Sequence, residues 1–173
     1  RRTDEDVAAM RDCLRRMDEA VLHQREHRWR SPGFAPARQV TVGLMGTGEM
    51  GRACASGLAA LSFNVIGWSR TPKADLPFPA YSGEREFNQF LSRSNILVSL
   101  LPSTPATRRL INRGVFLGLS REAPFGAPVF ISAGRGDTVV EADLLAALQD
   151  GTLRAASLDV FVNEPLPHDS PLW

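Results

Sequence analysis

The residues with the clearest chemical potential lie in two short segments near the end of the chain. Arg135 belongs to the segment 130–137, and Asp159 and Glu164 belong to the segment 158–167. Each segment starts with an apolar run typical of a buried strand and continues into a polar turn. Ligands of open α/β sheets bind beyond the carboxyl ends of the strands, so we expect both segments to face one crevice. There an arginine can bind a carboxylate, an aspartate can orient a carboxamide, and a glutamate can polarise a base.

A glycine-rich turn offers a second kind of chemistry, because it forms a G-x-G-x-x-G motif between a predicted strand and a predicted helix. In a dinucleotide-binding turn, Gly46 would make the tight turn, Gly48 would let a pyrophosphate approach, and Gly51 would let helix and strand pack closely. The helix adds unpaired N–H groups and a positive dipole end. An ordinary tight turn is the alternative. The expected phosphate site comprises Gly46, Thr47, Gly48, Glu49, Met50 and Gly51, with the Glu49 side chain directed into solvent.

The end of the second predicted strand indicates which dinucleotide is bound. An NAD site has an aspartate or glutamate here, which accepts hydrogen bonds from the ribose 2′-hydroxyl. This chain has Ser69 instead, followed by Arg70, Thr71 and its only lysine, Lys73. Arg70 can bind a 2′-phosphate through two hydrogen bonds and Lys73 can add charge, whereas a carboxylate would repel that group. We therefore expect NADP(H) to be preferred over NAD(H); the alternative is that these residues are solvated loop charges.

Alternating apolar runs and helical segments predict the scaffold that positions these residues. We expect strands over 40–45, 64–68, 95–101, 128–132 and 154–160, and helices over 50–61, 82–93, 110–119 and 141–149. Strands that alternate with helices form a parallel sheet through right-handed crossovers. The predicted fold is therefore α/β, a doubly wound parallel sheet of the Rossmann type, preceded by one long helix.

That preceding helix is predicted from a separate pattern at the start of the chain. Between residues 4 and 28 apolar residues recur at steps of three and four, which indicates an amphipathic helix. They are Val7, Met10, Leu14, Met17 and Val21. We expect an N-terminal helix over 1–30, a Pro- and Gly-containing linker over 31–38, and a dinucleotide-binding domain over 39–173. The helix can pack on its own domain or form a subunit contact, and the sequence leaves both open.

The composition excludes several classes of protein. The 173 residues are 43% hydrophobic and 23% charged with a net charge of +1. These values fit one globular domain and argue against a disordered chain or a dedicated nucleic-acid or membrane-surface binder. Two cysteines, Cys13 and Cys54, are typical of a reducing compartment, so we expect a cytoplasmic protein in which Cys54 is a packing thiol rather than a redox switch. The chain does not begin with Met, and we expect an internal fragment of a longer soluble protein.

The back half of the chain carries a family resemblance. Its characteristic segments are Ser132–Gly136, Val140–Leu148, Ala156–Phe161 and Glu164–Pro167. In combination they resemble the D-2-hydroxyacid dehydrogenases, and within them the NADPH-dependent glyoxylate/hydroxypyruvate reductases of bacteria. That subgroup is also similar in the segments Trp68–Thr71, Leu101–Thr107 and Ser170–Trp173. The resemblance covers essentially the whole chain.

The resemblance implies a role for each polar residue introduced above. Arg135 would bind the carboxylate and carbonyl of a keto acid, and Glu164 would orient a catalytic histidine and raise its pKa. These two are the predicted catalytic residues, and a structural ion pair between them is the alternative. Asp159 would bind the nicotinamide carboxamide. Further implied cofactor contacts are Leu101, Pro102, Ser103, Thr107, Ala133, Gly134 and Arg135. Relatives usually carry another small residue at Gly134, a departure expected only to loosen the turn.

Two parts of such an enzyme are expected outside this chain. The catalytic histidine would follow Trp173, and the lobe that supplies much of the substrate pocket would precede the first residue. The histidines present do not replace the missing one: His23 and His27 lack a third metal ligand, and His168 belongs to a solvated turn. We therefore predict no metal site, and an isolated chain that binds cofactor without catalysis.

The predicted partners are a small 2-keto acid, such as glyoxylate or hydroxypyruvate, and a second copy in a full-length homodimer, with no nucleic acid and no membrane.

The β-hydroxyacid dehydrogenases are similar in the glycine turn and the Arg70 turn, but they do not need the segments around Arg135 and Glu164. A non-enzymatic, corepressor-like module that senses the dinucleotide is the second alternative. Arg108 and Arg109 are expected to be a solvated pair, unless their loop folds inward to the phosphates.

Overall fold

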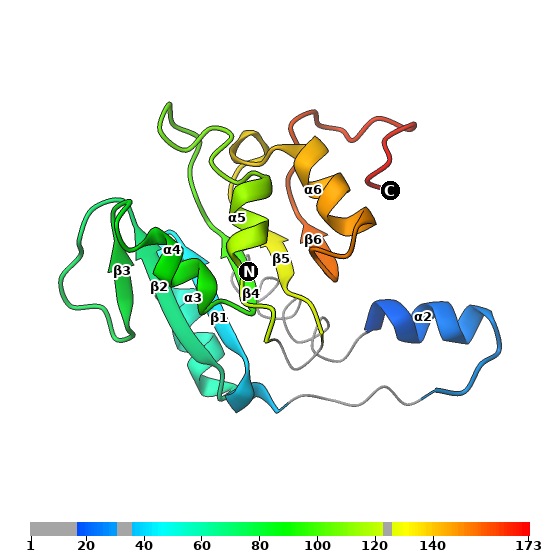
Figure 1. Cartoon of the computed structure of the whole chain (residues 1–173), viewed down its shortest axis with the longest axis horizontal. Coiled ribbons are helices and arrows are strands. Elements are labelled where there is room, and N and C mark those ends of the chain that lie inside the picture. The colour runs from blue at the N-terminus through cyan, green and yellow to red at the C-terminus, as the bar shows by residue number, and fades with distance from the viewer. Residues whose placement is uncertain (1–16, 31–35, 123–125) are drawn as a thin grey trace.

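A six-stranded parallel sheet forms the centre of the molecule. The structure is a computed structural model that describes residues 17–30, 36–122 and 126–173. The strands are β1 (Thr41–Met45), β2 (Asn64–Ser69), β3 (Ala80–Ser82), β4 (Ile96–Ser99), β5 (Val129–Ser132) and β6 (Ala155–Leu158). They pair in the order β3-β2-β1-β4-β5-β6, with every pair parallel (Figure 1). The winding reverses between β1 and β4, which confirms the doubly wound α/β fold and locates a ligand crevice beyond these two strands.

Helices cover both faces of the sheet. They are α3 (Glu49–Ala60), α4 (Phe87–Ser92), α5 (Arg113–Gly118) and α6 (Glu141–Gln149), with 3-10 turns η1 (Ala37–Gln39) and η2 (Gly136–Thr138). α3 packs on one face through residues such as Cys54 and Leu58. α4, α5 and α6 pack on the other face through Phe90, Phe116 and Leu144. None of the helices in the described ranges is long and apolar enough to cross a membrane.

The strands divide their side chains between two apolar layers. In β4, Leu97 faces the layer that contains α4, α5 and α6, whereas Ile96 and Val98 face the layer that contains α3. All three side chains are fully buried, and burying each stabilises the fold by about 1.5–3 kcal/mol. A register shift of one residue would exchange the two faces, so the cores fix where each strand ends and where the functional loops begin.

The region predicted as a helix over 82–93 differs from the prediction. Residues Ala80–Ser82 form the edge strand β3, and α4 begins only at Phe87. Gly83 has a φ of +65°, which turns the chain after β3. The Glu86 carboxylate then accepts a hydrogen bond of 2.5 Å from the N–H of the last residue of β3. The prediction missed β3 because a three-residue strand is too short to show a clear alternation.

The other predicted strands and helices of the domain are confirmed, several of them with shorter bounds. The strand over 95–101 ends at Ser99, the strand over 154–160 covers only 155–158, and the helix over 110–119 begins at Arg113. The last difference has a clear cause, because the Asn112 side chain accepts hydrogen bonds from the N–H groups of Gly114 and Val115. Such a side-chain cap starts a helix at the following residue.

The predicted N-terminal helix lies only partly within the described residues. Its described part is α2 (Met17–Arg25), which ends before the predicted end at residue 30. Glu19 pairs with Arg154 at 2.5 Å, so α2 contacts the chain immediately before β6. The described residues do not include the predicted apolar positions Val7, Met10 and Leu14, nor most of the predicted linker over 31–38. The long helix and these domain bounds therefore stay predictions.

Candidate functional site

The glycine-rich turn between β1 and α3 has three different environments at its three glycines. Gly46 has a φ of +110°, which favours glycine, and its N–H donates to the carbonyl oxygen of Trp68 at 3.0 Å. No heavy atom lies within 4 Å of a Cβ built on Gly48. A Cβ on Gly51 would overlap the carbonyl oxygen of Gly46. The turn thus has a tight bend, an open approach and a close helix–strand contact, in the order that a dinucleotide turn requires.

The start of α3 presents its backbone donors toward this open approach. Gly48 is the N-cap residue and makes no side-chain cap, so the first N–H groups of the helix are available to an anion. Glu49 is exposed, as expected. Thr47 is buried, and its hydroxyl has no hydrogen-bond partner within the described ranges. An open glycine, free helix N–H groups and a buried hydroxyl without a partner all fit a polar ligand at this turn.

A cleft of about 410 Å³ runs along the turn and the ends of β2 and β4. Its walls include most of the predicted cofactor residues: Gly46, Thr47, Gly48, Glu49, Met50, Gly51, Ser69, Arg70, Thr71, Lys73, Leu101, Pro102 and Thr107. Trp68, Leu100, Thr104, Ala106 and Leu110 also line it and were not named as cofactor contacts. Trp68, Thr104 and Ala106 belong to the segments Trp68–Thr71 and Leu101–Thr107 that carry the resemblance, whereas Leu100 and Leu110 lie close to the second of these segments. We call this hollow the glycine-loop cleft.

The corner of this cleft next to β2 is held by contacts that the sequence does not indicate. The Ser69 hydroxyl donates to the carbonyl oxygen of Thr71 at 2.9 Å, which closes the turn that carries Arg70. Arg52, on α3, donates to the carbonyl oxygens of Asp75 at 2.8 Å and Ala74 at 3.3 Å. Both loop cations, Arg70 and Lys73, are exposed to solvent. The corner is therefore positively charged and faces the start of α3.

A second hollow, of about 540 Å³, lies beyond the carboxyl ends of β5 and β6. It is lined by Ser103, Arg135, Gly136, Asp137, Val160, Phe161, Val162 and Glu164. It brings together both predicted catalytic residues, and we call it the arginine hollow. Among the described contacts, Arg135 donates to the carbonyl oxygen of Gly134 at 2.8 Å and Glu164 accepts from the N–H of Phe161 at 2.9 Å. They do not pair with each other there, which disfavours the structural ion pair.

The turn that carries Glu164 is fixed from two further sides. The N–H of Val162 donates to a carboxylate oxygen of Glu141 at 2.8 Å. Gly136 packs so closely on the turn that a Cβ there would overlap the carbonyl oxygen of Phe161. Glu141 is the first residue of α6. Sequence reasoning missed it because its position is that of an ordinary acidic residue at a helix start.

The two hollows share a wall, the loop between Pro102 and Arg109. The Ser103 hydroxyl donates to the Asp137 carboxylate at 2.5 Å, and the Arg108 Nε lies 3.3 Å from the same carboxylate oxygen. The N–H of Arg109 donates to the carbonyl oxygen of Asp137 at 2.9 Å. Arg108 thus pairs with Asp137 at this wall while its side chain stays 64% exposed, and Arg109 is exposed as well, so both arginines lie on the solvated surface as expected. Ser103 lines the arginine hollow and not the glycine-loop cleft.

The remaining predicted cofactor contacts lie between these walls. Ala133 and Gly134 are buried behind the loop, and a Cβ on Gly134 would lie 2.5 Å from the carbonyl oxygen of Leu101. The glycine therefore permits a close approach of two loops, which corrects the expectation that it only loosens the turn. Asp159 is exposed at the end of β6, where its N–H donates to the carbonyl oxygen of Ser132 at 2.9 Å.

The histidines add no second site. His27 has a φ of +54° and lies beyond the end of α2, so His23 and His27 do not lie on one helix, contrary to the N-terminal helix predicted over 1–30. His168 is exposed, and within residues 17–30, 36–122 and 126–173 no cluster of His, Cys, Asp or Glu side chains could hold a metal ion.

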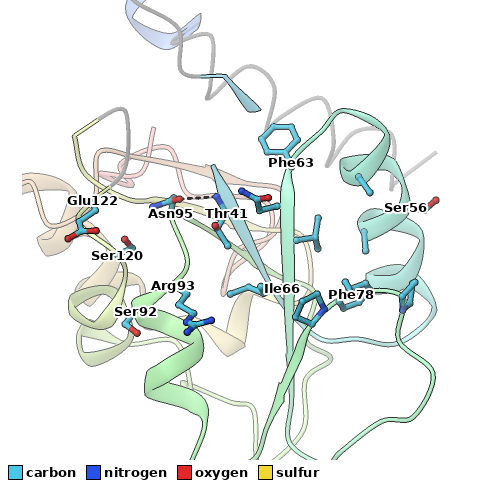
Figure 2. A pocket seen from close by; sticks show the side chains of 16 residues that line it. Thr41, Ser56, Phe63, Ile66, Phe78, Ser92, Arg93, Asn95, Ser120 and Glu122 are labelled. Carbon is cyan, nitrogen blue, oxygen red and sulfur yellow. Dashed lines mark hydrogen bonds between the residues drawn. The ribbon is translucent and has the colours of Figure 1, made fainter. Parts of the chain in front are cut away.

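A third hollow, of about 890 Å³, lies at the opposite end of the strands, where their amino ends meet (Figure 2). Thr41 and Asn95 line it at the amino ends of β1 and β4, joined by a hydrogen bond of 2.8 Å between the Thr41 N–H and the Asn95 side chain. Phe63 and Phe78 give part of it an apolar wall, and none of the predicted site residues lines it. The two hollows at the carboxyl ends therefore contain the candidate site.

Comparison with known proteins gives this site a context. The family described as "D-isomer specific 2-hydroxyacid dehydrogenase, NAD binding domain" matches residues 7–173. Glyoxylate/hydroxypyruvate reductase A from Photorhabdus laumondii is 41% identical over 167 residues, which are 96% of this chain and 52% of that protein. Glyoxylate/hydroxypyruvate reductase A from Serratia proteamaculans is 40% identical over 160 residues, which are 92% of this chain and 50% of that protein.

Solved structures agree with this match. A probable 2-hydroxyacid dehydrogenase from Rhizobium etli, in complex with NADP, HEPES and L(+)-tartaric acid, superposes with a TM-score of 0.95 at 41% identity. An NADPH-dependent glyoxylate/hydroxypyruvate reductase from Sinorhizobium meliloti, in complex with NADP and sulfate, does so with a TM-score of 0.93 at 44% identity. Each comparison covers 99% of this chain and 54% of the other. The chain thus spans about half the length of the curated relatives it matches and of these two structures.

Proposed function

The chain belongs to the D-isomer-specific 2-hydroxyacid dehydrogenase family, and we propose that it is the cofactor-binding half of a reductase that transfers hydride from NADPH to a small 2-keto acid such as glyoxylate or hydroxypyruvate. The family match covers the NAD-binding domain, so use of a nicotinamide dinucleotide follows directly from it. It also decides against the β-hydroxyacid dehydrogenase alternative. The proposed parts are a cofactor domain over 39–173, a preceding helix over 1–30 and a linker over 31–38.

The proposed cofactor site is the glycine-loop cleft. The pyrophosphate would contact the N–H groups around Gly48 at the start of α3, where the helix dipole favours negative charge. At the far corner, Arg70 and Lys73 would bind a 2′-phosphate, and Ser69 brings no negative charge against it. The preference for NADPH over NADH is supported by this corner and by the NADP present in the complex of the Sinorhizobium meliloti reductase.

The proposed substrate side is the arginine hollow. When bound, the reduced nicotinamide supplies a hydride to the carbonyl carbon of the keto acid. The Arg135 guanidinium would bind the substrate carboxylate and face the negative charge that develops on the carbonyl oxygen. Glu164 would hold a histidine from the rest of the protein in its charged form, ready to protonate that oxygen. Asp159 would bind the carboxamide and so select the face of the ring.

The observation that carries this proposal is the shared wall of the two hollows. Ser103 stands beside Arg135 in the lining of one hollow, and Pro102 lines the other. A dinucleotide that follows the glycine-loop cleft past this loop would bring its reactive end to Arg135. In the full-length protein, the histidine and the lobe that completes the substrate pocket would come from residues outside this chain. We further propose a cytoplasmic homodimer.

The test uses the full-length protein and follows the oxidation of NADPH and NADH by absorbance with glyoxylate, hydroxypyruvate and pyruvate. We expect fast oxidation of NADPH with at least one small 2-keto acid and slower oxidation of NADH. The isolated 173-residue chain should bind NADPH but give no steady turnover, since in this proposal the histidine and the second lobe come from residues outside it. Tight binding without turnover by the full-length protein would favour a dinucleotide sensor instead.

A further inference from the structure

The turn after β6 presents two successive backbone N–H groups, and each is bound by a different glutamate. The N–H of Phe161 donates to an oxygen of Glu164 at 2.9 Å, within the same turn. The N–H of Val162 donates to Glu141 at 2.8 Å, from the start of α6. The second bond joins elements 21 residues apart in the chain. The turn that aims Glu164 is therefore shaped by a carboxylate that belongs to another element.

We propose that Glu141 is a positioning residue that sets the direction of the Glu164 carboxylate, an inference that rests on the proposed function of Glu164. The bond from the Phe161 N–H fixes one oxygen of Glu164 and leaves the other available to the arginine hollow. The Phe161 N–H belongs to the peptide between Val160 and Phe161, and its direction is kept only while the next peptide, between Phe161 and Val162, keeps its orientation. Glu141 holds this peptide through the adjacent N–H.

Because of the packing around it, the position of the peptide between Phe161 and Val162 depends on the hydrogen bond to Glu141. Gly136 lies against it so closely that a Cβ would overlap the Phe161 carbonyl oxygen, so the peptide cannot tilt toward η2. Val162 and Glu164 are themselves exposed, so burial of their side chains does little to hold the turn. Release of the Val162 N–H would thus let the turn move outward, away from Arg135. A displacement of about 1 Å in a catalytic group can lower a rate by about a hundredfold.

Asp143 provides a matched control on the same helix. It also lies in the first turn of α6, and its carboxylate also accepts a backbone hydrogen bond, at 3.0 Å from the N–H of Arg113. Arg113 starts α5 and does not line the arginine hollow. The two acidic residues share the helix dipole and a backbone partner, but only Glu141 reaches the turn of Glu164.

The experiment measures kcat and KM of the full-length protein with NADPH and its best keto acid. Glu141→Gln keeps the length of the side chain and an acceptor oxygen but removes the charge. Glu141→Asp keeps the charge at the helix start and withdraws the acceptor from the Val162 N–H. We expect kcat to fall about threefold for Glu141→Gln and about tenfold for Glu141→Asp, with KM for NADPH unchanged. For Asp143→Asn, kcat should stay within about twofold of the value for the wild-type protein.

A double-mutant cycle separates positioning from general stability. With Glu164 already changed to Gln, Glu141→Asp should cause no further loss of kcat, because the residue through which it acts is gone. Additive losses would overturn the inference, as would a larger effect of Glu141→Gln than of Glu141→Asp, or an equal effect of Asp143→Asn. If the unchanged full-length protein reduces no keto acid, the proposed function fails instead, and the inference fails with it.

Discussion

The Ser103 hydroxyl and the Asp137 carboxylate lie 2.5 Å apart and join the wall of the glycine-loop cleft to the turn that follows Arg135. Arg108 contacts the same carboxylate oxygen at 3.3 Å. The other carboxylate oxygen of Asp137 is buried without a partner among the described residues. A cofactor and a substrate on the two sides of this wall would therefore meet a surface whose position depends on one aspartate.

Replacing Asp137 by Ala should weaken both sites together. Loss of the bonds from Ser103 and Arg108 frees the loop, and a side-chain hydrogen bond to a charged group contributes about 1.5–3 kcal/mol. Partial exposure of the pair reduces that value, so we expect about a three- to tenfold rise in Kd for NADPH and in KM for the keto acid. Ser103→Ala should reproduce part of both changes. Titration calorimetry and steady-state kinetics on the full-length protein measure them, and a change confined to one ligand contradicts the shared wall.

Arg70→Asp should change which dinucleotide is bound. The new carboxylate would repel a 2′-phosphate and accept hydrogen bonds from a free 2′-hydroxyl. We expect Kd for NADPH to rise about a hundredfold while Kd for NADH changes by less than about threefold. Arg121→Asp makes the same change in net charge at an exposed position outside the lining of the cleft and serves as the control. Equal losses for both cofactors would show that Arg70 does not bind the 2′-phosphate.

The three glycines of the turn should separate binding from folding. Gly48→Ala adds a methyl group where nothing lies within 4 Å, at a φ of −75° that alanine adopts. It should leave the thermal midpoint nearly unchanged and lower affinity for NADPH by about tenfold or more, because the methyl group stands where the pyrophosphate approaches. Gly51→Ala forces a methyl group against the Gly46 carbonyl oxygen and should cost about 1–3 kcal/mol of folding free energy. A thermal scan with and without NADPH distinguishes them; equal destabilisation by both would contradict this assignment.

Much of this architecture is predictable from the sequence because it rests on local signals. The glycine motif sits between an apolar run and a helical pattern, and the structure has a strand, a turn and a helix there. The alternation of strands and helices likewise predicts the parallel sheet. β3 escaped prediction because three residues at a sheet edge carry too little pattern.

The contacts that hold the site have no such signal. Glu141 reaches Val162 across 21 residues, Arg52 reaches Asp75 across 23, and Ser103 reaches Asp137 across 34. Each is a surface-type residue at an unremarkable position of its own element. Only the fold brings these residues to their partners, so the positioning groups of a site are harder to predict than its reactive ones.

The free energy of unfolding at acidic pH should depend on Asp150, the C-cap residue of α6. A hydrogen bond from Thr152, followed by the hydrogen bond and charge of Arg113, lowers the pKa of this carboxyl from 3.8 to about 2. A depressed pKa in the folded state contributes stability that is complete above the unfolded value and is lost as pH falls from about 4 toward 2. Asp150→Asn should therefore lower the free energy of unfolding at pH 6, and the difference from the unchanged chain should shrink below pH 4. Arg113→Met removes only the second cause and should give a smaller difference. Urea unfolding across this range tests both, and a difference that is constant with pH would show that the charge of Asp150 does not stabilise the fold.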